Sequence, residues 1–170
     1  VLVTGVQTCA LPIYTPFGTE HAKDHRVPDL KEFWQVGRDP EAAAGAIAVP
    51  GAVKSAGTAA GTGTGAADVD ALPPNIWPEE LPAFRATLET LFAALDATGR
   101  RLLEALAPGL GVPSDYFDPL VRTGNSVLRV IHYPPVRADA DPQAVRSAAH
   151  EDINFLTILV AARGAGLQLL

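Results

Sequence analysis

The features that this sequence lacks already narrow its class. It has one cysteine, Cys9, which rules out an internal disulfide and fits a reducing, cytoplasmic compartment. No apolar run approaches the roughly 18 to 20 residues that cross a bilayer, so we expect no membrane partner. No secretory signal is visible either. With 19 acidic and 13 basic residues, the net charge is −6, which argues against a nucleic-acid-binding surface.

The sequence also contains no methionine and opens on Val1, so we expect that it is not a complete translated gene. Residues 3–13, VTGVQTCALPI, resemble the conceptual translation of a common sequencing-adapter oligonucleotide. We therefore exclude residues 1–13 from the predicted fold, as one would exclude a fusion scar. The alternative is a genuine β-strand, which the composition of the segment permits.

The chain of 170 residues is long enough for one domain with a sizeable core. Its 15 glycines and 15 prolines indicate substantial loop content. Residues 41–72 are rich in Ala, Gly and Thr, which bury too little apolar area to offset the entropy of ordering them. We predict a flexible linker there. Its glycines are not followed by Gly-Lys-Ser/Thr, so they do not form a phosphate-binding loop.

Residues 73–118 form the predicted helical segment. Apolar side chains recur there at steps of three and four, which predicts a long helix that packs on a sheet. Pro82 suits the first turn of this helix, Pro108-Gly109 ends it, and Gly99 is a point where it could bend. A short helix over residues 113–117, capped by Ser114 or Asp115, is predicted next. The apolar stripe consists of Leu81, Phe84, Leu88, Leu91, Phe92, Leu95, Leu102, Leu103 and Leu106.

Residues rich in β-branched side chains predict the strands. Residues 124–133 alternate and end at a Pro-Pro pair, which cannot continue a ladder. Residues 155–160 and 167–170 are two further strands joined by a glycine-containing connection. Residues 29–36 are predicted as a short strand or an edge segment, and residues 136–149 as a loop.

His150 and Asp152 stand two residues apart, directly ahead of the apolar run 155–160. In an extended chain, side chains at i and i+2 project to the same face, so these two converge while Glu151 turns away. A neutral imidazole and a carboxylate are two of the three ligands of the facial triad that holds non-haem Fe(II). The pattern alone is weak, because a surface turn before a strand would produce it equally well.

The neighbouring segments resemble the isopenicillin N synthase-like family of 2-oxoglutarate/Fe(II)-dependent dioxygenases. His150-x-Asp152, the strand LTIL at 156–159 and GLQL at 166–169 are similar to the family's iron-binding strand and following hairpin. Residues 128–135, LRVIHYPP, resemble its strand ending in Tyr-Pro. Residues 14–18 and 29–38 resemble its N-terminal region.

This resemblance implies an α+β fold: a partial double-stranded β-helix, or jelly-roll, with a long backing α-helix. Residues 14–40 would be a remnant of the N-terminal oxygenase region, and residues 119–170 the first part of a jelly-roll barrel left incomplete by C-terminal truncation. The implied activity is oxidation of a small organic substrate with Fe(II), O2 and 2-oxoglutarate. The isopenicillin N synthase subgroup uses no 2-oxoglutarate, so that requirement stays open.

The resemblance also assigns site residues. His150 and Asp152 would be iron ligands, whose affinity for the metal should rise with pH as His150 loses its proton. Tyr133 and Arg129 are candidates to face the co-substrate, although a packing tyrosine and a barrel-rim salt bridge are plainer roles. His132 is not predicted as a ligand, because adjacent strand residues face opposite ways and the family does not use that position.

One departure from the family concerns activity. A third ligand, a His, and an Arg-x-Ser pair that anchors 2-oxoglutarate are expected downstream, but only 18 residues follow Asp152 and none is His. We therefore expect these groups beyond Leu170 and this chain to be inactive. Two alternatives stay open: a zinc hydrolase using the His-x-Asp pair, and a non-catalytic binding module that exposes the apolar helix stripe as an interaction face.

Overall fold

The structure is a computed structural model that describes residues 2–4, 14–22, 25–38, 74–122, 124–152, 154–160 and 166–168. The predicted linker, residues 41–72, lies outside the described residues, and so do most of the adapter-like segment and residues 169–170.

Among these residues, five strands form one antiparallel sheet in the order β2-β3-β4-β1-β5. The central pairing is between β3 and β4, which stay in register from Glu32 opposite His132 to Gly37 opposite Val127. Strands β2 and β5 lie at the two edges, so the sheet is open as far as the structure describes it. The strands are β1 Leu2–Thr4, β2 Tyr14–Thr15, β3 Glu32–Gly37, β4 Val127–His132 and β5 Leu156–Ile158.

The predicted long helix is confirmed as α2, Pro82–Leu106. It opens on a proline, because the missing N–H of Pro82 costs nothing in the first turn, and Gly99 does not break it. A 3₁₀ turn, Ala107–Leu110, follows and ends at Gly111, whose φ of 75° is the left-handed conformation that glycine adopts without strain. None of the helices that the structure describes is long and apolar enough to span a membrane.

The short helix predicted at 113–117 was misplaced. Residues 114–117 form turns, and the helix α3 spans Asp118–Val121 with Phe117 as its N-cap. The reason is Pro119, which lies in the first turn of α3, where a proline is favourable.

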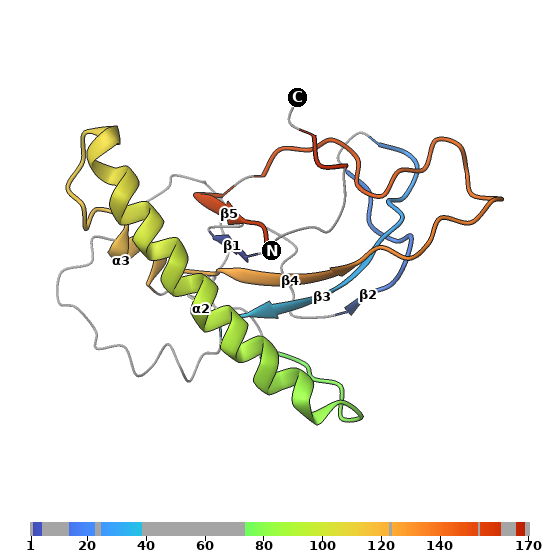
Figure 1. Cartoon of the computed structure of the whole chain (residues 1–170), viewed down its shortest axis with the longest axis horizontal. Coiled ribbons are helices and arrows are strands. Elements are labelled where there is room, and N and C mark those ends of the chain that lie inside the picture. The colour runs from blue at the N-terminus through green and yellow to red at the C-terminus, as the bar shows by residue number, and fades with distance from the viewer. Residues whose placement is uncertain are drawn as a thin grey trace, which may run out of the picture.

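Helix α2 crosses one face of the sheet, as Figure 1 shows. The centre of the predicted apolar stripe is buried there with two strand residues, and this cluster is the core. At the ends of the stripe, Leu81, Leu102 and Leu106 are exposed. The buried cluster consists of Val36, Leu88, Phe92, Leu95 and Leu128, with Trp34, Trp77, Phe84, Leu91 and Ile158 packed against it.

The opposite face of the sheet is also buried. Phe33, Gln35 and Val127 alternate with the core residues along β3 and β4, yet they are 2 to 4% exposed. The loop that precedes β3 and the loop that follows β4 meet beyond the same end of these two strands (Figure 1). They lie within residues 16–31 and 133–152. Their contact includes a hydrogen bond from the Leu30 N–H to the Val145 carbonyl at 2.8 Å.

Some of the predicted strands are confirmed and others differ from the structure. Strand β4 confirms the prediction at 124–133, while β5 covers only the middle of residues 155–160. Strand β3 lies inside the sheet and not at its edge. Residues 166–168, where the last strand was predicted to begin, have no regular structure.

Strand β1 differs from the sequence-based expectation, because its three residues belong to the adapter-like segment that we excluded from the fold. It lies between β4 and β5, with Leu2 opposite both Leu128 and Ile158. A short apolar segment can pair with open sheet edges of many kinds, so this pairing leaves the origin of the segment a prediction. An antiparallel sheet with a backing helix agrees with the expected α+β class, while the jelly-roll stays a prediction.

Candidate metal centre

His150 and Asp152 lie in the extended segment that leads into β5, and their side chains converge as the spacing predicts. Nε2 of His150 is 3.5 Å from Oδ1 of Asp152. The side chains are 51% and 45% exposed, so a solvent ion can reach both atoms.

The Asp152 carboxylate is oriented by the strand that follows it. The Thr157 hydroxyl donates a hydrogen bond of 2.7 Å to Oδ2 of Asp152. The same hydroxyl accepts one of 3.0 Å from the Asn154 amide. With Oδ2 held in this way, Oδ1 is the oxygen that faces His150.

The His150 ring is oriented by the backbone that precedes it. Its Nδ1 lies 2.8 Å from the carbonyl oxygen of Ala148. A carbonyl only accepts, so this bond requires the proton on Nδ1 and, in the neutral ring, leaves the lone pair on Nε2. Nε2 is the nitrogen that faces Asp152.

These two side chains fit a shared divalent metal ion. Two ligands about 2.1 Å from one ion and at right angles lie roughly 3 Å apart, slightly closer than the observed pair. Each ligand already has the second hydrogen bond that usually fixes metal-binding groups. Within the part of the chain that the structure describes, no cluster of three or more His, Cys, Asp or Glu side chains could hold a metal.

The pair lies toward the sheet face opposite α2. A Cβ placed on Gly99 of α2 would be 3.6 Å from Ile158 and 4.0 Å from Leu156, so those two side chains face the helix. Thr157 lies between them and therefore points to the other face. Arg129 shares that face, because its neighbour Leu128 is in the core under α2.

The two residues predicted to face a co-substrate have other surroundings. The Arg129 guanidinium is 3.7 Å from Glu20 and lies 5.0 Å above the ring of Phe33. These contacts match the plainer salt-bridge role. Tyr133 follows the end of β4 and is 37% exposed. Their roles toward a co-substrate stay predictions.

Sequence reasoning missed the groups that orient the pair. Thr157 appeared only as part of a strand pattern, and Ala148 acts through its backbone, which carries no sequence signal. A hydroxyl five residues after the carboxylate could have been found by asking what satisfies Oδ2 of Asp152.

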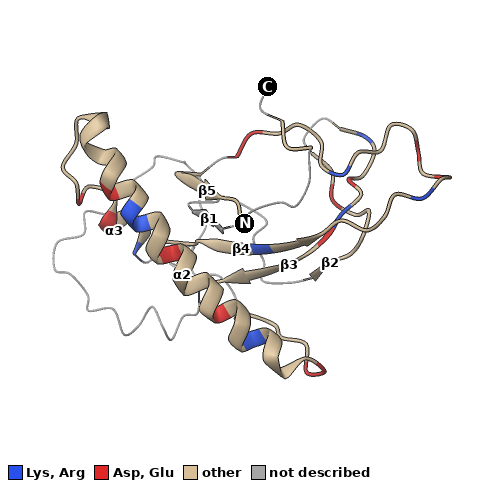
Figure 2. Cartoon of the chain, in the orientation of Figure 1, with Lys and Arg blue, Asp and Glu red and all other residues tan. Residues whose placement is uncertain are grey.

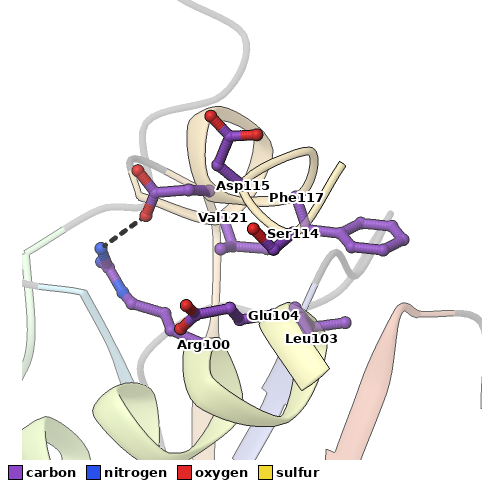
Figure 3. Close-up of a pocket in the computed structure, with 8 residues that line it drawn as sticks. Arg100, Leu103, Glu104, Ser114, Asp115, Phe117 and Val121 are labelled. Carbon is purple, nitrogen blue, oxygen red and sulfur yellow. Dashed lines mark ion pairs between the residues drawn. The ribbon is translucent and has the colours of Figure 1, made fainter. Parts of the chain in front are cut away.

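A second candidate site is a cavity of about 220 Å³ between the end of α2 and the segment 114–121 (Figure 3). Among the described residues that line it, the one cation is Arg100, which is engaged by the carboxylates of Asp96 and Asp118 at 3.0 and 3.6 Å. With its charge balanced in this way, this lining has no cation to offer an anionic ligand. The lining residues are Arg100, Leu103, Glu104, Ser114, Asp115, Phe117, Asp118 and Val121.

Comparison with known proteins gives a consistent answer. The chain is 37% identical over 102 residues to the proline hydroxylase buaE of Petromyces alliaceus, covering 58% of this chain and 32% of that protein. It is 31% identical over 150 residues to the 2-oxoglutarate-dependent dioxygenase caaD of Aspergillus niger, covering 86% and 39%. Other relatives are likewise named 2-oxoglutarate-dependent dioxygenases, and one is named a 2-oxoglutarate-Fe(II) type oxidoreductase.

Among solved structures, a full-length Neurospora crassa protein in complex with alpha-KG matches with a TM-score of 0.51 and 26% identity. The match covers 78% of this chain and 37% of the Neurospora protein. The chain thus spans about a third of the length of the dioxygenases it matches. No family model matches it.

Proposed function

We propose that this chain is part of a non-haem Fe(II)- and 2-oxoglutarate-dependent dioxygenase, in which His150 and Asp152 supply two of the metal ligands. The observation that carries the proposal is the 3.5 Å approach of Nε2 and Oδ1, with the outer atom of each side chain fixed by its own hydrogen bond. The similarity to named dioxygenases supports the same chemistry.

In this proposal each residue has a defined task. His150 offers a neutral nitrogen because Ala148 holds its proton on the far side of the ring. Asp152 offers one carboxylate oxygen because Thr157 holds the other. Bound Fe(II), with O2 and 2-oxoglutarate, supplies the oxidising chemistry, and the substrate is a small organic molecule.

The proposal includes three further parts. The whole protein closes its sheet into a jelly-roll barrel and works in the cytoplasm. The metal centre is completed by a third ligand, which the described residues do not supply. Two ligands leave the geometry around a metal undefined, so this chain by itself binds metal weakly and does not turn over 2-oxoglutarate.

The test is Mn(II) titration of the chain, followed by paramagnetic broadening of the His ring resonances. We expect the His150 ring to broaden first, and this broadening to be lost in Asp152→Ala and kept in the control. The matched control is His132→Ala, because His132 also pairs with a carboxylate, Glu32, at 2.7 Å, but on the α2 side of the sheet. Equal broadening of the His150 ring in Asp152→Ala and the wild type would refute the site, and iron-dependent succinate formation by this chain would refute its inactivity.

The alternatives receive less support. A docking helix would expose its apolar stripe, whereas Leu88, Phe92, Leu95 and Leu103 of α2 are at most 9% exposed. This burial favours a core helix over a binding module. A zinc hydrolase needs a third protein ligand, which the described residues do not offer either.

A further inference from the structure

We propose that Asp29 is a positioning residue for the metal centre: it holds the backbone of Ala148, and Ala148 in turn fixes the ring of His150. This inference deepens the proposed function and rests on it for the statement that His150 binds metal. The hydrogen bonds themselves are a property of the metal-free chain.

Asp29 is the most deeply buried carboxylate that the structure describes, at 1% exposure. Its two oxygens have different partners. Oδ2 is 2.8 Å from Nζ of Lys31, while Oδ1 accepts a hydrogen bond of 3.0 Å from the Ala148 N–H. A carboxylate kept out of water needs both contacts, since an unsatisfied oxygen there is costly.

Ala148 connects this buried carboxylate to the site. It is 8% exposed, so its peptide groups find their partners inside the protein. Its N–H points to Asp29, and its carbonyl accepts from Nδ1 of His150. A residue whose N–H and carbonyl are both held cannot rotate freely, so the orientation of the imidazole is set by Asp29, 119 residues away from Ala148.

The cation beside Asp29 keeps this arrangement together. Burial by itself would lower the pKa of Lys31, but the hydrogen bonds to Asp29 and Glu20 and the attraction of their negative charges together outweigh burial and raise that pKa. Lys31 therefore stays charged, with Glu20 as its second partner at 2.9 Å. Removing Asp29 alone would leave Lys31 with one partner, which makes the simple alanine variant uninformative.

A matched pair of double variants separates positioning from charge burial. Both carry Lys31→Met, which removes the buried ion pair, and replacing both partners of such a pair is far milder than removing one. Asp29→Asn then keeps an oxygen that accepts from the Ala148 N–H. Asp29→Leu has a similar volume and no acceptor. The two double variants differ in that hydrogen bond and in the amide N–H2 of the asparagine, which has lost Lys31 as a neighbour.

The first readout is the tautomer of His150 in the metal-free chain, from the ¹⁵N shifts of its ring nitrogens. We expect the wild type and the Asn variant to keep the proton on Nδ1, and the Leu variant to show a mixture of tautomers. The second readout is Mn(II) affinity, which we expect to be about tenfold lower in the Leu variant than in the Asn variant. Losing a residue that orients a metal ligand typically lowers metal affinity by about 10- to 100-fold, and we expect the lower value.

The outcomes separate the two proposals. The same tautomer in both variants overturns the role of Asp29, and so does the same Mn(II) affinity in both variants when the wild type binds Mn(II) at His150. A tautomer change in the Asn variant also overturns it, and this outcome remains decisive if the Leu variant does not fold. If the tautomers differ as expected but Mn(II) broadens no His150 signal even in the wild type, the positioning role stands and the metal site is wrong.

Discussion

Two pairs of histidine and carboxylate, His132 with Glu32 and His150 with Asp152, lie toward opposite faces of the described sheet. Their geometries differ, and the difference determines which of them can bind a metal ion. Nδ1 of His132 is 2.7 Å from Oε1 of Glu32, so that pair is closed by a direct contact. In the other pair, the facing atoms of His150 and Asp152 are farther apart and both outer atoms are already satisfied. Of these two, the second pair presents Nε2 and Oδ1 at a separation that suits two ligands of one ion.

The closed pair predicts a dependence of stability on pH. Hydrogen bonds from His132 and then from Tyr14 hold the pKa of Glu32 below its ordinary value of 4.5. A carboxyl whose folded pKa is depressed stabilises the fold above its unfolded pKa and loses that contribution as pH falls through the folded value. We therefore expect Glu32→Gln to unfold more easily than the wild type at pH 7 and the difference to shrink below about pH 4.

Urea unfolding of both proteins across this pH range measures the effect. Tyr14→Phe, which removes only the second hydrogen bond, should show a smaller difference with the same sign. The pH dependence of the Tyr14 contribution runs in the opposite direction to that of Glu32. Its hydrogen bond to Glu32 raises its pKa above 10.0, so this contribution is present at neutral pH and is lost as pH rises through the raised value. A Glu32→Gln difference that stays constant from pH 7 to pH 3 would contradict the assignment.

At the scale of the element, α2 contains a glycine that the structure does not require. Gly99 is buried, and a Cβ there would meet Ile158 and Leu156 at 3.6 and 4.0 Å, which are ordinary contact distances. Glycine in a helix interior costs roughly 0.5–1 kcal/mol relative to alanine. We expect Gly99→Ala to stabilise the fold by about that amount, measured by urea unfolding.

A larger side chain at position 99 tests how closely α2 packs against Ile158 and Leu156 of β5. Gly99→Leu would push β5 away from the helix, and overpacking of this kind costs roughly 1–3 kcal/mol. Ala94→Gly, at an exposed position of the same helix, should show the ordinary glycine penalty. If Gly99→Ala destabilised the chain as much as Gly99→Leu does, then β5 would lie closer to α2 than described.

The elements that the sequence predicted well are those with a local cause. The spacing of apolar residues every three or four positions predicts α2, and alternation followed by Pro134-Pro135 predicts β4. Where competing turn signals decide the outcome, prediction failed, because the short helix moved to Pro119. Where distant partners decide it, the prediction left two options, a short strand or an edge segment at residues 29–36. The structure has the short strand, β3, which is internal because β2 pairs with it.

At the scale of the whole molecule, the same distinction explains the candidate site. His150 and Asp152 could be predicted because convergence at i and i+2 is a local property of an extended chain. The groups that hold them could not, because the contact of Asp29 with Ala148 joins two loops that only the folded sheet brings together. A polar group whose partner is so distant in sequence gives no pattern to detect.

A second long-range contact joins the end of β3, helix α2 and the segment before β4. It predicts a substitution that should lower the stability of the whole chain. Charged residues of both signs are interspersed along α2 (Figure 2), but they are unequal in burial. Arg38, after β3, is 2.6 Å from Asp96 of α2 and also donates to the Gly124 carbonyl at 3.1 Å. The side chains of Arg38 and Asp96 are 14% and 13% exposed, so this ion pair is largely shielded from water.

Removing the carboxylate leaves the Arg38 charge with backbone carbonyls as its remaining acceptors, and breaking a buried pair in this way costs about 3 kcal/mol. We expect Asp96→Asn to lower the free energy of unfolding by roughly this amount. Glu89→Gln is the matched control on the same helix, since the Glu89 side chain is 42% exposed in its pair with Arg85 and should cost less than about 0.5 kcal/mol. Urea unfolding with intrinsic tryptophan fluorescence measures both, because Trp34 and Trp77 pack against the core that Asp96 borders. Equal losses in the two variants would mean that the Arg38–Asp96 pair is solvated and that α2 is held to the sheet by apolar packing alone.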